Sequence, residues 1–98
     1  MDVPSTQLPD SPAASDISAI LKERGKRYGE FADHGRISQC LKMVMHQQEQ
    51  WPFLALEQKE ALEMIQHKIA RILNGDPNWK DTWDDIAGYA KLIGDKLK

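Results

Sequence analysis

The stretch KIARILNGDP at residues 68–77, followed by DTWDDIAGYA at residues 81–90, decides how this chain folds. In the first segment apolar residues recur at helical spacing up to Asn74. Gly75 is the residue type that most often follows a helix end, and Asp76-Pro77 favours a turn. In the second segment Asp81 is a good N-cap, and the carboxylates after it suit the helix dipole. The stretch therefore predicts a helix, a sharp turn and a second helix.

The same spacing extends outward in both directions. It predicts helices at 17–24, 33–49, 56–74 and 81–97. We expect Gly25 to end the first helix and Trp51-Pro52 to end the second. No run of alternating β-branched residues is present, so the fold class is all-α: a small helical bundle of three long helices plus a short N-terminal helix. Its core stripe in the third helix is Leu62, Ile65, Ile69, Ile72 and Leu73.

The chain divides into a tail and one domain. Residues 1–15 are rich in Pro and Ser, and such a composition cannot bury enough apolar surface to offset the entropy of ordering. We expect a flexible, disordered tail there. Residues 16–98 have the size and composition of a single helical domain.

Charge and composition exclude several classes of protein. The formal net charge is −2, so there is no direct signal for nucleic-acid binding. No apolar run reaches the roughly 20 residues that span a bilayer, and no signal peptide is apparent, so we expect a cytoplasmic protein with no membrane partner. The single cysteine, Cys40, excludes an internal disulfide and lies on the apolar stripe of its helix, which predicts a buried thiol.

Each of the last two helices carries an acidic sector opposite its apolar stripe. In the third helix this sector holds Glu60, Glu63, His67 and Arg71. Carboxylates three or four residues apart share a helix face, and two such faces can form an oxygen site for Mg²⁺ with Lys68, Arg71 and Lys80 near the phosphates of a ligand. The alternative is that both acidic faces simply meet water.

Gly88 and Tyr89 lie within or beside the acidic sector of the fourth helix. A mid-helix glycine costs about 1 kcal/mol relative to alanine, so it indicates close approach of a ligand or of another helix. A tyrosine can stack on a base or donate to a phosphate. We expect the segment 85–89 to face Glu63 and Arg71.

The remaining residues that could bind a metal or form an interface give weaker signals. The three histidines lack the spacing of a metal site, so we expect His34, His46 and His67 on the surface or at helix flanks. Three tryptophans and four methionines are a large apolar area for 98 residues, which predicts a homo-oligomer.

Three segments, 20–29, 68–77 and 81–90, resemble a family of small phage and prophage proteins of unknown function. The chain is also distantly similar to the all-α nucleoside triphosphate pyrophosphatases of the MazG type, which bind Mg²⁺ through paired carboxylates. That similarity implies metal ligands at Glu60, Glu63, Asp81 and Asp85. Thr82 stands where the family has a further carboxylate, so Asp81 takes its place and catalysis stays open.

Two functions follow as hypotheses. The first is a phage-derived helical accessory domain that binds nucleotide phosphates, with Mg²⁺ as cofactor. Its phosphate-binding residues would be Lys68, Arg71, Lys80, Gly88 and Tyr89. The second is a non-enzymatic inhibitor in the host cytoplasm that binds a host defence protein or sequesters a nucleotide signal.

Overall fold

A computed structural model describes residues 11–98 as four α-helices and one short 3₁₀ helix, with no strand in that range. They are α1 (Ser11–Tyr28), α2 (Phe31–His46), η2 (Trp51–Phe53), α3 (Leu56–Asn74) and α4 (Lys80–Gly94). The all-α prediction is confirmed. No helix in the described range is long and apolar enough to cross a membrane.

The first helix is longer than the sequence predicts. It has 18 residues, begins inside the segment expected to be a tail, and runs through Gly25 to Tyr28. Gly25 is exposed and has open space around it, so it is tolerated within the helix rather than ending it. The rest of the predicted tail, residues 1–10, lies outside the described residues.

The helix pair at the centre of the sequence analysis forms as expected, with one correction. The bounds of α3 match the prediction, and Gly75 follows its end. Asp81 is not the cap of α4: the helix begins at Lys80, Trp79 occupies the N-cap position, and no side chain caps it. Asp76 instead stabilises the turn by accepting a 2.8 Å hydrogen bond from the backbone N–H of Asn78.

The end of α3 holds the turn between α1 and α2, which we call the elbow (residues 28–30). Gly29 has a φ of 78°, a left-handed conformation that glycine adopts without strain. The side-chain amide of Asn74 donates to the carbonyls on both sides of it, 2.8 Å to Tyr28 and 2.9 Å to Glu30. The N–H of Asp76 donates to the Arg27 carbonyl at 2.5 Å. The elbow is therefore fixed by backbone and amide hydrogen bonds.

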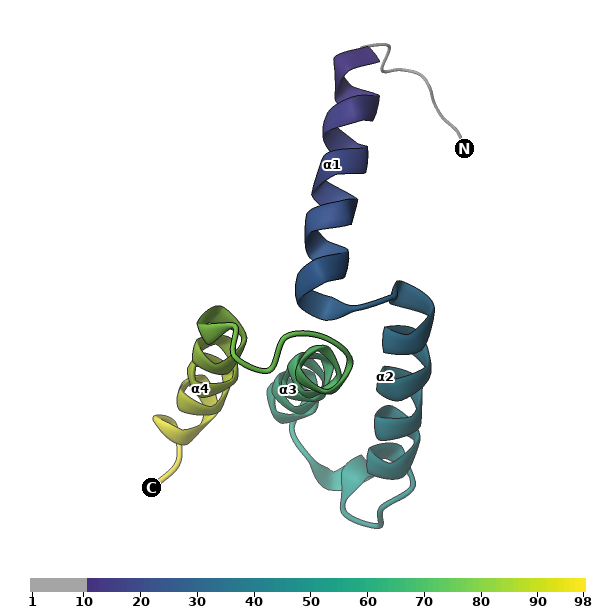
Figure 1. The fold of residues 1–98 in the computed structure, drawn as a ribbon. Coiled ribbons are helices and arrows are strands. Elements are labelled where there is room, and N and C mark those ends of the chain that lie inside the picture. Colours follow the sequence, from purple (N-terminus) through teal and green to yellow (C-terminus); the bar gives the residue numbers. More distant parts are fainter. Residues whose placement is uncertain (1–10) are drawn as a thin grey trace.

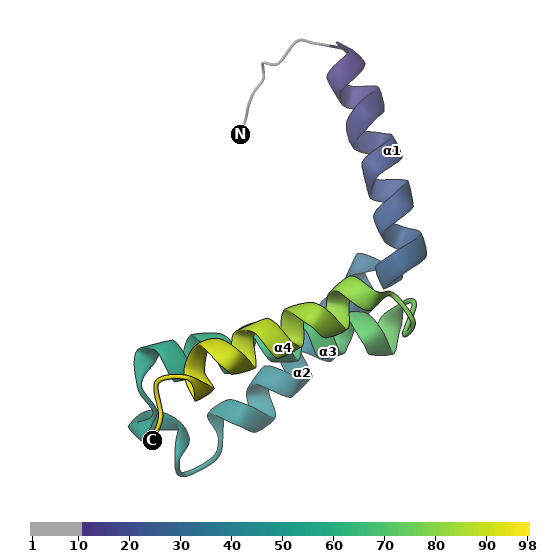
Figure 2. The same cartoon turned by 90° about the vertical axis from the view of Figure 1, so that its left-hand side faces the viewer.

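The helices form one layer with an arm rather than a closed bundle. α3 lies between α2 and α4 and packs against both, while α1 projects from the elbow away from the layer (Figures 1 and 2). Among the described residues only two apolar side chains are buried, Ala61 and Ala70. The predicted core stripe is only partly covered: Leu62, Ile69 and Leu73 are exposed. A single layer cannot cover both faces of its helices, which is why that expectation fails.

Two glycines provide a matched test of the elbow. Gly29→Ala should lower the free energy of unfolding by at least about 2 kcal/mol, because alanine resists the left-handed conformation and its Cβ would overlap the Asn74 carbonyl. Gly25→Ala, in open space within α1, should raise it by about 0.5–1 kcal/mol. Urea denaturation followed by circular dichroism measures both. Equal effects would contradict this account of the elbow.

Candidate functional site

The four carboxylates predicted to bind metal lie apart along α3 and α4. Glu63 contacts His46 of α2, with Oε2 2.7 Å from Nε2, and Asp85 contacts Lys68 at 2.9 Å. Glu60 and Asp81 are exposed. Within residues 11–98 no group of three or more His, Cys, Asp or Glu side chains is placed to hold a metal ion. In one chain these donors do not form a magnesium site, so the metal set stays a prediction.

The predicted phosphate-binding residues are also separated. The Lys68 side chain is only 11% exposed and is neutralised by Asp85, so the pair joins α3 to α4. Lys80 pairs with Asp84 on the surface, and the hydrogen bond that the lysine donates to this carboxylate raises the pKa of the lysine. Neither lysine is thus free of a carboxylate. Arg71 lies in a pocket with a second arginine, Arg24.

Gly88 and Tyr89 line a shallow hollow on α4 together with Asp84, Asp85 and Leu92. A Cβ at Gly88 would meet nothing within 4 Å, so helix packing within the described chain does not explain this glycine. The segment does not face Glu63 and Arg71 as expected. Asp85 contacts Lys68, whereas Glu63 and Arg71 contact α2 and α1 instead.

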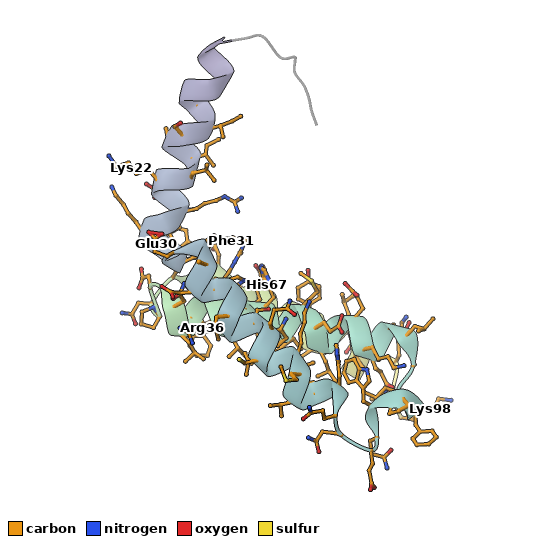
Figure 3. The ribbon with its side chains drawn as sticks, turned by 90° about the vertical axis from the view of Figure 1, so that its right-hand side faces the viewer. Lys22, Glu30, Phe31, Arg36, His67 and Lys98 are labelled. Carbon is orange, nitrogen blue, oxygen red and sulfur yellow. The ribbon has the colours of Figure 1, made fainter. Side chains whose placement is uncertain are left out.

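A different site lies at the elbow, where α1, α2 and α3 meet. It is a cavity of about 430 Å³, within the range of small-molecule sites, and we call it the elbow pocket. Figure 3 shows Glu30, Phe31 and His67 near the base of α1. The lining residues that matter chemically are Arg24 and Tyr28 from α1, Phe31 and His34 from α2, and His67 and Arg71 from α3.

Two arginines give the elbow pocket its charge. The Arg71 guanidinium lies 4.1 Å from the centre of the Tyr28 ring, an arrangement that orients it through cation–π attraction. Neither Arg24 nor Arg71 forms a salt bridge with any carboxylate of residues 16–98. Glu30 is the only acidic residue that lines the pocket. Two guanidiniums against one carboxylate favour an anionic ligand.

Two histidines meet at the inner wall of the elbow pocket. His34 Nε2 and His67 Nδ1 are 3.3 Å apart, and the rings meet edge to face. His34 is only 6% exposed, and its Nδ1 has no hydrogen-bond partner in the described part of the chain. Buried polar atoms are nearly always paired. His34 Nδ1 is therefore a buried polar atom that the described part of the chain leaves without a partner.

The surroundings of both histidines disfavour the protonated form. The pKa of His67 is lowered to about 4, chiefly by burial, then by the positive charge of Arg71 and, to a smaller extent, by His34, Lys68 and Lys42. Burial and Arg71 also lower the pKa of His34. A neutral imidazole carries one N–H donor and one acceptor nitrogen. The neutral rings therefore add polar atoms to the pocket wall without adding charge.

Sequence reasoning found Arg71 but missed most of this site. It placed His34 and His67 on the surface or at helix flanks; this was wrong for His34, which is buried, whereas His67 is half-buried. The two residues are 33 positions apart and meet only because the elbow turns α2 back along α3. Cys40 was expected to be buried and is exposed, because α2 directs only one narrow side toward α3. The proximity of His67 to Arg71, one helical turn apart, was the one signal available.

The histidine pair predicts how stability depends on pH. The pKa of His67 is about 4 in the folded chain and about 6.5 when unfolded, so the unfolded chain takes up a proton first as the pH falls. The stability linked to His67 is therefore complete above pH 6.5 and is lost progressively toward pH 4. Nuclear magnetic resonance should show the His67 ring neutral at pH 5, and His67→Gln should reduce the fall in Tm between pH 7.5 and 5. A ring that titrates near 6.5 would contradict this.

Comparison with known proteins gives a family and no more. No curated protein and no solved structure matches the chain. One family, a domain of unknown function designated DUF6378, matches residues 13–97, which include all of α2, α3 and α4 and most of α1. The elbow, the elbow pocket and the Lys68–Asp85 pair all lie within that match. The chain therefore belongs to the DUF6378 family.

Proposed function

We propose that this chain is a helical domain that binds nucleotide phosphates and that the elbow pocket takes the ligand. The observation that carries the proposal is the convergence of Arg24 and Arg71, both without a carboxylate partner among residues 16–98, beside Tyr28, Phe31 and the neutral histidine pair. A guanidinium donates two parallel hydrogen bonds to a phosphate, which makes arginine well suited to this ligand. We also propose that the chain is of phage origin, as its resemblance to small phage and prophage proteins implies.

Aromatic rings supply the second half of the recognition. Tyr28 already stacks against Arg71, and Phe31 lies parallel to His34 with ring centres 6.0 Å apart. Phe31 is largely exposed, so one of its faces is open to a partner. Nucleotide bases stack on such rings with little preference between bases. A ligand with phosphates at the arginines and its base at Phe31 would use both features.

The elbow pocket suits phosphate better than the hollow around Gly88. That hollow is lined by Asp84 and Asp85, and two carboxylates repel a phosphate. Lys68 and Lys80 are each paired with one of these acids. In the elbow pocket, positive charge exceeds negative charge. We therefore move the proposed phosphate contacts from α4 to the elbow and keep Arg71 from the original set.

Magnesium is a separate part of the proposal. The resemblance to MazG-type enzymes implies a metal held by Glu60, Glu63, Asp81 and Asp85, and these side chains do not cluster within one chain. The elbow pocket needs no metal to hold a phosphate, because guanidinium groups supply the charge. Nucleotide binding is therefore tested both with and without Mg²⁺. Conversion of bound nucleotide would favour an enzyme, and binding without conversion would favour sequestration.

Calorimetric titration with ATP, adenosine and inorganic phosphate, each with and without Mg²⁺, tests the proposal. We expect ATP to bind most tightly, since only ATP offers both the phosphates and the base. Arg24→Gln and Arg71→Gln should each weaken ATP binding at least about tenfold, which is the loss of roughly one charge-assisted hydrogen bond.

Arg36→Gln is the matched control, because Arg36 is an exposed arginine of α2 outside the pocket. It should leave binding unchanged. Absence of ATP binding with and without Mg²⁺, or equal loss in all three variants, would overturn the proposal.

A further inference from the structure

An apolar face on α3 and α4 is left uncovered, on the side of α3 opposite the elbow pocket. Its centre is a groove of about 360 Å³ between the two helices, lined by Leu62, Ile65, Ala90, Gly94 and Leu97 among others. Ile69 and Leu73 continue the row on α3, seven and eleven residues after Leu62, and Trp83 and Ala87 continue it on α4 at the matching spacing of seven. We call these nine residues the apolar face.

The spacing of the apolar face is that of helices that pack against other helices. On α4 its residues fall at 83, 87, 90 and 94, in steps of four, three and four, and Leu97 follows three residues after the helix ends. Such a row presents one continuous seam along a helix. Trp83 is 52% and Leu73 65% exposed, so the ends of the seam have large side chains in solvent. Alanine and glycine at its middle allow close approach of a second helix.

The fold needs this face to be covered. Its helices form one layer, and its buried apolar side chains in the described range are two alanines. A domain normally needs a second layer to bury a hydrophobic core. A cover required for folding has to be present whenever the chain is made, which favours a second copy of the same chain over a separate partner.

We propose that the apolar face packs against the same face of a second copy, so that α3 and α4 of both copies form a four-helix dimer around a two-fold axis. A face of this kind must be complementary to itself. None of its nine residues is charged, so no like charges oppose each other across the axis. The elbow pocket stays open, because His67 and Arg71 lie about half a helical turn around α3 from Leu62 and Ile69.

The size of the face is sufficient for a specific dimer. The face runs over eleven residue steps on each helix, from Leu62 to Leu73 on α3 and from Trp83 to Gly94 on α4, which is about 17 Å, and two adjacent helices are about 20 Å wide. The flat footprint is therefore roughly 340 Å² on each copy. Five large side chains of the face protrude and are between 37% (Ile69) and 65% (Leu73) exposed, so their accessible surface is larger and the total for two copies comes to roughly 1,200 Å², the lower end for specific interfaces.

Sedimentation equilibrium with two matched pairs of variants tests this dimer. The wild-type chain should have twice its formula mass of 11.2 kDa. Leu62→Glu and Ala90→Glu should each weaken self-association at least tenfold, because they place a charge inside the apolar face. Val44→Glu on α2 and Ala19→Glu on α1 make comparable changes at exposed positions off the face and should leave the dimer intact.

A spin-label measurement covers the case in which a face variant fails to fold. Position 90 (Ala90→Cys with Cys40→Ser) should show a distance between copies within roughly 20 Å, because facing helices pack 8–10 Å apart. A label on native Cys40, which is exposed on α2, should show a longer distance. A monomeric wild-type chain, face variants that stay dimeric, or a shorter distance at Cys40 than at position 90 would each overturn the proposal.

Discussion

The side-chain amide of Asn74 is the contact on which the rest of the structure depends. Its Nδ2 donates to the carbonyls of both Tyr28 and Glu30, the residues on either side of Gly29. Together with the backbone hydrogen bond from Asp76 to Arg27, this group sets the direction in which α1 leaves the layer and the position at which α2 begins. Arg24 and Tyr28 reach the elbow pocket only because α1 is held in that direction, and His34 meets His67 only because α2 starts where it does.

Asn74 belongs to α3, which packs against α2 on one side and against α4 on the other. Polar contacts join it to its neighbours: Ser38 donates to Gln66 of α3 at 3.1 Å, and Lys68 pairs with Asp85 of α4. Such partly buried polar contacts fix the register between helices more than they add stability, because removing the groups from water is costly. Part of the apolar surface of α3 and α4 stays open in a single layer, and this open surface is the basis of the proposed self-association.

The sequence predicted the helical class, the bounds of α3 and the turn after it, since these follow from local spacing and from Gly75 and Asp76. It did not predict the length of α1, because an exposed glycine inside a helix looks the same in sequence as a glycine at a helix end. The candidate site was largely missed for another reason. His34 and His67 acquire their chemistry from a contact between distant segments, and nothing in either local sequence signals it. The carboxylates of α3 and α4 suggested a metal site because they share helix faces. In the structure Glu63 is paired with His46, Asp84 with Lys80 and Asp85 with Lys68.

The distance between α1 and α3 tests the role of Asn74 most directly. Spin labels at Lys22 and Glu60, both exposed, can be introduced with Cys40→Ser and diluted with unlabelled chain so that only distances within one copy are measured. The intact chain should give one narrow distance distribution. Asn74→Ala should broaden it, because α1 loses both amide hydrogen bonds at the elbow, while Asn78→Ala, the same substitution at an exposed turn position, should not. A distribution that stays narrow in Asn74→Ala would contradict the claim that this side chain fixes the arm and builds the pocket.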